Sequence, residues 1–200
     1  MDAIQAFYVH CTGAIESADF GDSDNLYCRY CFSIGADWGI VGGVDLGTSQ
    51  MAQKSANRDQ DIVWNFPIDV TFKSTNIYGW PRMAISVAGL DFLGRDVIKG
   101  YGSVLIPLTP GRHTIEVDTF VPIASSTINN IFSWLLGNPP EFFDSKIVCH
   151  GNNRDVTRTQ KTGRVKLHLN IFTKGMRDAG YMIADSSVQV QHAAATAPPV

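Results

Sequence analysis

The segment Val63–Lys73 constrains the fold more than any other part of this 200-residue chain. Five large apolar side chains occupy every second position from Trp64 to Phe72, and mostly polar residues separate them. Successive side chains of a β-strand point to opposite faces, so a period of two places the apolar set on one face. The segment is therefore predicted to be a strand with one buried face. Pro67 lacks a backbone N–H and predicts an edge strand or a bulge at that point.

The same alternation recurs along the chain and predicts a mainly β protein. Clear strands are expected at Leu26–Ile34 and Arg164–Phe172, and weaker ones at Phe7–Thr12, Met83–Val87, Gly102–Leu108 and Thr114–Val121. Residues typical of turns separate these runs and predict loops at Asp19–Asn25, Gly35–Gly47, Thr75–Pro81 and Thr109–Gly111. About seven or eight short strands favour an antiparallel β-sandwich.

One segment carries a helical period instead. Apolar residues recur three and four positions apart within Thr127–Leu136, a serine that can cap the helix precedes it, and Gly137 follows it. A short helical insertion is therefore predicted there, and a single helical turn is predicted at Met176–Tyr181. The small and polar composition after residue 182 predicts a disordered tail over 183–200, which leaves one domain over 5–182.

Composition excludes several classes of function. Sixteen Lys and Arg against nineteen Asp and Glu give a net charge of −3, so no polycationic signal for nucleic acid is present. The N-terminal residues lack the pattern of a signal peptide, and the apolar runs are far shorter than the ~20 residues of a membrane helix. Four cysteines are too few for a disulfide scaffold. We expect a soluble, cytoplasmic protein.

Sequence motifs give no support for catalysis or for a cofactor. The chain has no Gly-x-Ser-x-Gly, no phosphate-binding glycine loop and no His-Glu-x-x-His. Cys28 and Cys31 have the spacing of a zinc pair, but residues three apart on a strand point to opposite faces. No second pair of ligands completes a four-ligand site, so buried reduced thiols are the preferred interpretation over zinc.

A long distinctive stretch, Trp64–Pro81, resembles the B9-domain family, together with Leu26–Phe32 and Lys99–Gly102. The resemblance extends over about Phe7–Tyr181. It implies a C2-like β-sandwich without enzymatic activity, a scaffold subunit of the Meckel-syndrome (tectonic-like) complex. It also implies a location at the ciliary base, in the transition zone or basal body, and a role in ciliogenesis and in the barrier to membrane-protein diffusion. The expected partners are two other B9 paralogues and further members of that complex.

C2-like sandwiches often bind calcium through aspartates on their end loops, which requires several converging carboxylates. Three positions of the late loop that are acidic in the calcium-binding pattern are here Gly89, Asp91 and Val97. The earlier loop has Asp19, Asp22 and Asp24. With one carboxylate left in the late loop, we expect turn-forming aspartates rather than a calcium site.

Two groups of apolar side chains are candidates for contact with a partner protein. The turn Tyr78-Gly79-Trp80-Pro81 offers Tyr78 and Trp80, residue types that are enriched in binding hot spots but also fill the ends of sandwiches. A second group falls outside the apolar stripe of the predicted helix or follows it: Trp134, Leu136, Phe142 and Phe143. Such a group implies either a wider buried face or an exposed patch that binds another subunit.

Basic residues cluster on and before the last long strand: Arg154, Arg158, Lys161, Arg164 and Lys166. An anionic membrane surface attracts such residues by about 1 kcal/mol each, so peripheral lipid binding is the alternative function. The competing interpretation is a solvated strand face whose charges discourage pairing at the sheet edge.

Overall fold

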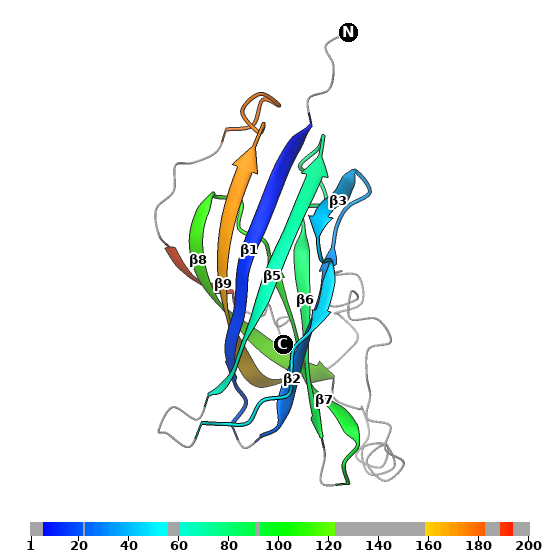
Figure 1. Ribbon diagram of the computed structural model, residues 1–200, viewed down its shortest axis with the longest axis vertical. Helices are drawn as coiled ribbons and strands as arrows, with labels where there is room; N and C mark the ends of the chain where they lie inside the picture. Colours follow the sequence, from blue (N-terminus) through cyan, green and yellow to red (C-terminus); the bar gives the residue numbers. More distant parts are fainter. Residues whose placement is uncertain are drawn as a thin grey trace.

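The computed structural model describes residues 6–21, 23–55, 61–90, 93–122 and 159–182, and the strand 189–193. Figure 1 shows its ten strands. Their bounds are β1 Phe7–Asp19, β2 Leu26–Ser33, β3 Trp38–Gly43, β4 Leu46–Thr48, β5 Ile62–Ser74, β6 Arg82–Leu90, β7 Asp96–Leu105, β8 Gly111–Pro122, β9 Thr159–Lys174 and β10 Gln189–Ala193. No helix occurs within these described ranges, and none of the elements there is a candidate membrane-spanning helix.

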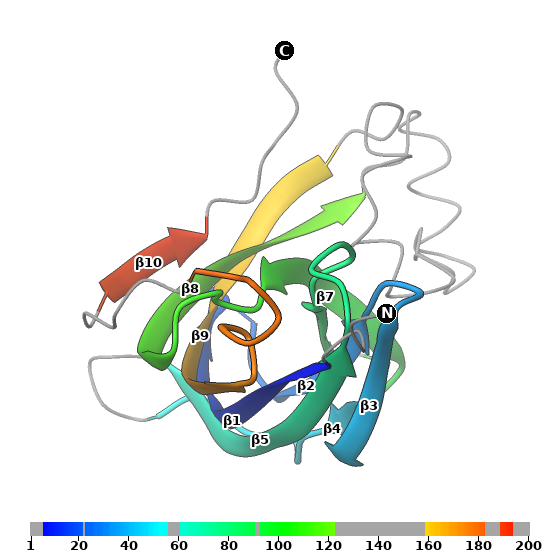
Figure 2. The same ribbon diagram turned by 90° about the horizontal axis from the view of Figure 1, so that it is seen from above.

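The strands form one continuous sheet that curls round (Figure 2), so that its two halves face each other like the two sheets of a sandwich. The half called the first sheet below has the order β3-β5-β1-β9-β8, and the half called the second sheet has the order β7-β6-β2-β4. A single pair of residues, Tyr101 and Phe120, connects the two sheets between β7 and β8. On the opposite side, the chain from β3 to β4 passes from the edge of β5 to the edge of β2. All these pairings are antiparallel, which confirms the predicted all-β, C2-like sandwich.

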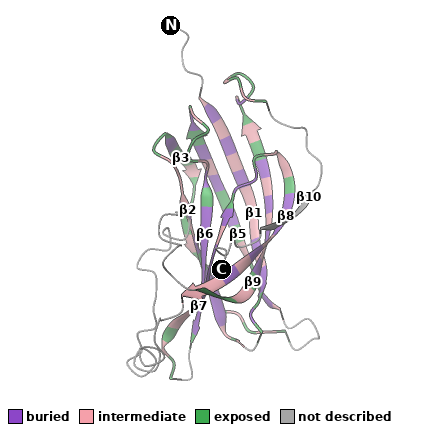
Figure 3. Cartoon of the chain, turned by 180° about the vertical axis from the view of Figure 1, so that it is seen from behind, coloured by how far each residue is buried: buried purple, intermediate pink, exposed green. Residues whose placement is uncertain are grey.

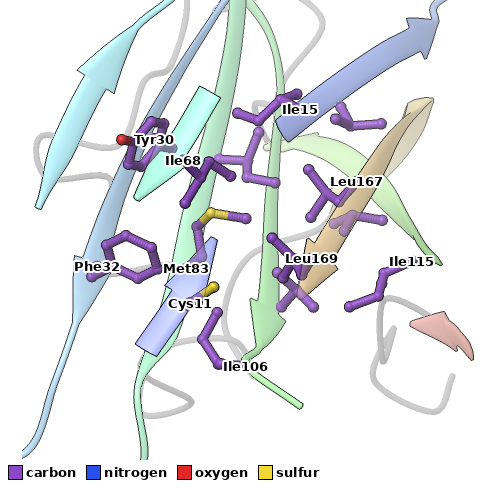
Figure 4. Packing of buried hydrophobic residues seen from close by; sticks show 14 of the residues in the cluster. Cys11, Ile15, Tyr30, Phe32, Ile68, Met83, Ile106, Ile115, Leu167 and Leu169 are labelled. Atoms are coloured by element: carbon purple, nitrogen blue, oxygen red, sulfur yellow. The ribbon is translucent and has the colours of Figure 1, made fainter. Parts of the chain in front are cut away.

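The core lies between the sheets and is built from alternate residues of the long strands. Along β5, Trp64, Ile68 and Phe72 are buried, whereas Asp69 and Lys73 are exposed, as the period of two predicts. Figure 3 shows the same alternation along β1. In Figure 4, residues of both sheets, among them Met83, Leu167 and Leu169, point into this shared interior. Burial of these apolar side chains is the main stabilising contribution to the fold.

Pro67 lies where β5 is an edge strand, one of the two alternatives predicted, and a bulge occurs just before it in the chain. Between Ile15 and Ser17 of β1 the register shifts, because two residues of β5 oppose one residue of β1. One of those two is Asn65, which adopts a positive φ of 45°. Pro67 itself lies beyond the part of β5 that pairs with β3, which ends at Val70. Its missing N–H therefore interrupts no pairing with β3.

Two predictions need correction. The segment Gly35–Gly47 is not a loop throughout, since it holds β3 and the start of β4. Its glycines favour a turn, but the buried side chain of Trp38 and pairing with β5 keep the chain extended. Residues 189–193, within the predicted disordered tail, form β10, which pairs in parallel with the edge of β8. Pairing can order a polar segment that lacks a strand pattern of its own.

The predicted turn at Met176–Tyr181 forms a single helical turn without becoming a helix. The Tyr181 N–H donates to the Met176 carbonyl at 2.9 Å, and the Gly180 N–H donates to the Arg177 carbonyl at 3.0 Å. This pair of hydrogen bonds is the Schellman pattern that ends helices. The predicted helix Thr127–Leu136 lies outside the described residues. The connection that contains it leaves β8 at Pro122 and returns at Thr159, and these two residues pair directly.

Candidate interaction surface

The turn between β5 and β6, residues Thr75–Pro81, is called the aromatic turn below. Local hydrogen bonds fix its backbone. The Asn76 N–H donates to Ser74 Oγ at 3.1 Å, and the Tyr78 N–H donates to Asn76 Oδ1 at 3.0 Å. Serine and asparagine side chains stabilise turns in this way because they replace backbone acceptors. The short polar residues before Tyr78 therefore hold the aromatic turn in one conformation.

Two tryptophans form a base beneath the aromatic turn. Trp38 and Trp80 meet edge to face with their ring centroids 5.0 Å apart. The Trp38 indole N–H donates to the Tyr78 carbonyl at 2.8 Å, and the Trp80 indole N–H donates to the Ile106 carbonyl at 2.8 Å. Buried indoles need such a partner, and these two connect the aromatic turn to β3 and to the end of β7.

The aromatic turn also contacts the turn between β2 and β3, both through the Asn76 side-chain amide, which donates to Asp37 Oδ2 at 3.3 Å, and through backbone atoms. The Gly35 N–H donates to the Gly79 carbonyl at 2.9 Å. A Cβ atom on Gly79, whose φ is +71°, would overlap the Gly35 Cα atom. Both the conformation and the close approach therefore require glycine at position 79.

The structure separates the two residues predicted in this turn. Trp80 packs against the core and belongs to the base, whereas the Tyr78 side chain is 79% exposed and the neighbouring Ile77 is 42% exposed. A tyrosine on a rigid turn loses little conformational entropy when it is buried by a partner. Tyr78 and Ile77 thus form a preorganised apolar projection, and sequence reasoning missed Ile77, which is apolar but has no distinctive pattern.

Three residues of the predicted basic cluster lie within the described part of β9, and they do not form an open cationic patch. Each one forms an ion pair with a carboxylate of a neighbouring strand: Lys161–Asp118 at 2.8 Å, Arg164–Glu116 at 2.9 Å and Lys166–Glu16 at 2.9 Å. The cross-strand register of β9 with β8 and β1 brings these opposite charges together. This arrangement favours a solvated, charge-compensated strand face. Arg154 and Arg158 lie outside the described residues.

These pairs shift the ionisation of the acids. Burial alone would raise the pKa of Glu16, but hydrogen bonds from Lys166 and His168 outweigh it and hold the pKa below its usual range. His168 Nε2 lies 2.6 Å from Glu16 Oε2. The hydrogen bond from Lys161 lowers the pKa of Asp118 in the same way. Both carboxylates therefore remain charged at neutral pH and neutralise the neighbouring cations.

The aspartates considered for calcium already accept backbone hydrogen bonds. Asp19 Oδ1 accepts from the Gly21 N–H at 3.1 Å, and Asp24 Oδ1 accepts from the N–H groups of Asn25 and Lys54 at 2.8 Å. The bonds from Lys54 and Asn25 lower the pKa of Asp24. These are turn-forming roles.

Gly89, one of the late-loop positions considered for calcium, lies on β6. A Cβ on Gly89 would overlap Leu26 Cδ2, so this position cannot take an acidic side chain without displacing the core. Val97 is half-buried, while Asp22 and Asp91 lie outside the described residues. The described part of the chain holds no group of three or more metal-ligating side chains. The lack of calcium binding stays a prediction.

The cysteines of the Cys-x-x-Cys pair lie as strand geometry predicts. Cys28 is buried in the core, and Cys31 is half-buried on the opposite face of β2. Burial raises the pKa of the Cys28 thiol, and burial together with the charge of Asp69 raises the pKa of Cys11 to about 12. Such thiols stay protonated at neutral pH and are poor metal ligands.

A polar cluster on the second sheet escaped the sequence analysis. The Tyr27 hydroxyl donates to Asp96 Oδ2 at 2.5 Å, and the Arg29 guanidinium lies 3.3 Å from the same oxygen and 4.9 Å from the centre of the Tyr27 ring. Tyr27 and Arg29 share a face of β2, which the sequence indicates. Their joint partner is far along the chain, and no local pattern identifies it.

Comparisons with a family model and with curated proteins all match this chain to B9 proteins. The family model described as "Ciliary basal body-associated, B9 protein" matches residues 9–172. The chain is 50% identical to mouse B9 domain-containing protein 1 over 175 residues, covering 88% of this chain and 86% of that protein. It is 47% identical to the human protein of that name over 183 residues, covering 92% and 90%. It is 28% identical to B9 domain-containing protein 2 of Xenopus laevis over 172 residues, covering 86% and 96%.

Among solved structures, a C2 domain of plant extended synaptotagmin 1 matches with a TM-score of 0.39 and 10% identity, covering 82% of this chain and 92% of that one.

Proposed function

Because the chain belongs to the B9 family of ciliary basal body-associated proteins, we propose that it is a non-enzymatic scaffold subunit at the ciliary base. The observation that carries this proposal is the match to the family over residues 9–172. In its finer form, the proposal places the protein in the tectonic-like complex of the transition zone. There it supports ciliogenesis and the barrier to diffusion of membrane proteins between cilium and plasma membrane.

The aromatic turn is the contact site that the described residues support best. A scaffold acts by holding partners, and binding energy in protein interfaces is concentrated in a few rigid aromatic or apolar anchors. Tyr78 and Ile77 are exposed, and the turn that presents them is fixed by hydrogen bonds to Trp38 and Gly35. A surface that is already ordered loses little entropy on binding.

The proposed partners are two other B9 paralogues and further members of the same complex. The second predicted contact group, Trp134, Leu136, Phe142 and Phe143, lies outside the described residues and stays a prediction. Its test is the double variant Trp134→Ala, Phe142→Ala, assayed both for folding and for paralogue binding. Loss of several kcal/mol of stability would place the two side chains in the core instead.

Co-purification with each paralogue separately tests the scaffold function. Wild-type protein is expected to form a stoichiometric complex with at least one of them. Tyr78→Ala should leave the melting temperature nearly unchanged, since exposed substitutions usually alter stability by less than about 0.5 kcal/mol. It should weaken binding by about 2 kcal/mol, the size of an interface hot spot. Leu46→Ala, also at an exposed side chain but on β4, is the matched control. Failure of the wild-type protein to bind either paralogue would overturn the proposal.

Peripheral binding to anionic lipid is the alternative function. The ion pairs of Lys161, Arg164 and Lys166 argue against it, because a cation that already faces a carboxylate has little charge to offer a membrane. Co-sedimentation with vesicles distinguishes the two functions. Strong binding that is lost at about 1 M salt, where the Debye length is only about 3 Å, would favour the membrane module.

A further inference from the structure

The outer face of the first sheet has two parts with different charge patterns. The part toward the aromatic turn holds a group that we call the lysine–aromatic patch: Tyr8, His10, Lys73, Phe172 and Lys174. Lys73 of β5, Tyr8 of β1 and Lys174 of β9 lie opposite one another in one row across the three strands. In the next row, His10 lies opposite Phe172. Strands β9, β1 and β5 run side by side in Figure 1.

Aromatic rings reach the surface in this patch. The Lys73 ammonium lies 5.9 Å from the centre of the Tyr8 ring. The His10 and Phe172 rings stack with centroids 6.1 Å apart, and Phe172 remains 53% exposed. His10 Nδ1 is 2.9 Å from Thr71 Oγ1, which orients the imidazole against the sheet. An exposed phenylalanine beside an oriented imidazole provides apolar area in a fixed position.

The lysines of the patch lack the compensation found in the other part of the same face. There, Lys161, Arg164 and Lys166 each form an ion pair. Within the ranges that the structure describes, Lys73 and Lys174 form no ion pair. The same holds for the exposed Arg112 of β8, which lies opposite Asn170, in the row next to that of His10 and Phe172. The patch is therefore positive on a chain whose net charge is −3.

We propose that the lysine–aromatic patch binds an acidic, extended segment of a partner protein. This inference rests on the proposed scaffold function, and it adds the chemistry of the partner. Lys73 and Lys174 emerge from strands two spacings apart, about 10 Å. A segment in the polyproline II conformation rises about 3.1 Å per residue and repeats every three residues, so carboxylates three residues apart lie on one side at about 9 Å. The residues between those two carboxylates would cross Tyr8.

A protein segment fits the face better than a lipid bilayer does. A bilayer that reached the patch would also cover the acidic side chains elsewhere on this face, including Asp69, whose side chain is 70% exposed and lies 3.9 Å from His10. An anionic leaflet would be repelled there. A narrow segment can cross the row of Tyr8 and avoid most of these carboxylates.

The test uses charge reversal with a matched control. The variant Lys73→Glu, Lys174→Glu changes two exposed cations of the patch. The control, Arg82→Glu, Lys99→Glu, makes the same change in net charge on the second sheet. The milder pair Lys73→Gln, Lys174→Gln serves if charge reversal impairs folding, which circular dichroism and thermal melting report.

Each full-length protein is measured with three probes: immobilised poly-L-glutamate, vesicles of phosphatidylcholine with phosphatidylserine, and the purified B9 paralogue that binds the wild-type protein. We expect wild type and control to bind poly-L-glutamate, and patch reversal to reduce that binding by about tenfold or more, as when attractive charge contacts become repulsive. Paralogue binding should fall in parallel and show a weaker salt dependence.

Different failures have different meanings. If patch reversal leaves both poly-L-glutamate and paralogue binding unchanged, the inference is wrong while the scaffold function stands. If the patch is needed for vesicle binding but not for poly-L-glutamate binding, the surface is a lipid site and the inference is again wrong. If no paralogue binds wild type yet the patch still selects poly-L-glutamate, the proposed function fails and the acidic specificity of the patch is retained.

Discussion

Replacing Gly79 by alanine tests whether backbone contact holds the aromatic turn in place. Gly79 has a φ of +71°, and an added Cβ would overlap the Gly35 Cα and lie 3.0 Å from the Gly35 nitrogen. The atoms it meets belong to the backbone, so no side-chain rotation can relieve the overlap. The turn between β2 and β3 and the aromatic turn would have to separate, and their hydrogen bond at 2.9 Å would lengthen.

The magnitude has two parts. A non-glycine residue in the left-handed region costs about 1–2 kcal/mol. Forcing one additional carbon into a packed contact costs about 1–3 kcal/mol more. Gly79→Ala should therefore lower the free energy of unfolding by about 2–5 kcal/mol. Gly94→Ala is the matched control, since Gly94 has a φ of +76° and an added Cβ there meets nothing within 4 Å. Gly94→Ala should lower the free energy of unfolding only by the cost of the left-handed conformation, about 1–2 kcal/mol.

Equilibrium unfolding in urea, followed by tryptophan fluorescence, measures both variants. Trp38 and Trp80 form the base of the turn and report its separation directly. In a chain of this size, each kcal/mol lowers the melting temperature by about 2–4 °C. Equal destabilisation by the two alanines would refute the reasoning, because it would show that the approach of Gly35 adds nothing beyond the backbone conformation.

Phe72→Ala should lower the free energy of unfolding by about 3–5 kcal/mol, because Phe72 is fully buried. Asp69→Ala, on the exposed face of the same strand, should change it little. Comparable losses of stability in urea unfolding would mean that the faces of β5 are wrongly assigned. Millimolar calcium should leave the melting temperature unchanged, because the Asp24 carboxylate already accepts hydrogen bonds from the backbone. A ligand at a hundred times its dissociation constant would add about 2.7 kcal/mol to the free energy of unfolding. A rise of several degrees that a chelator reverses would therefore contradict this prediction. The pKa of Cys11 is raised from 9.0 to about 12, so the contribution of this thiol to stability is complete below pH 9 and is lost as the pH rises toward 12. A Cys11→Ala variant should therefore lose less stability than the wild type between pH 9 and pH 12. An identical alkaline loss in both proteins would exclude this thiol as the cause.

The long strands could be predicted because their burial follows directly from a period of two. Over most of β5 and the middle of β9, every second residue is buried, as the sequence indicates. β3 could not be predicted, since Gly39, Gly42 and Gly43 are typical of turns. Only pairing with β5 and burial of Trp38 keep that segment extended. Tertiary pairing overrode local preference at this point.

The candidate site was predictable to the extent that it depended on local chemistry. Tyr78 was identified from the composition of its turn, and the structure shows that it is exposed, while its contact role stays a prediction. The sequence left open whether Trp80 contacts a partner or fills the end of the sandwich, because its hydrogen-bond partner, the Ile106 carbonyl, is 26 residues away. The ion pair of Lys161 with Asp118 was hidden for the same reason: it requires the register of β8 against β9, which no single strand reveals.

The direct pairing of Pro122 with Thr159 bears on how this chain can diverge among relatives. The connection between them starts and finishes at adjacent points of one hairpin, so its length imposes no stretch on either strand. The entropy of closing such a connection grows only with the logarithm of its length, about 0.6 kcal/mol per doubling. The entropy of closing the connection therefore sets little limit on insertions and deletions between these two residues. We expect this point of the chain to tolerate the exchange of whole segments, and to be where B9 proteins acquire differences from one another without altering the sandwich.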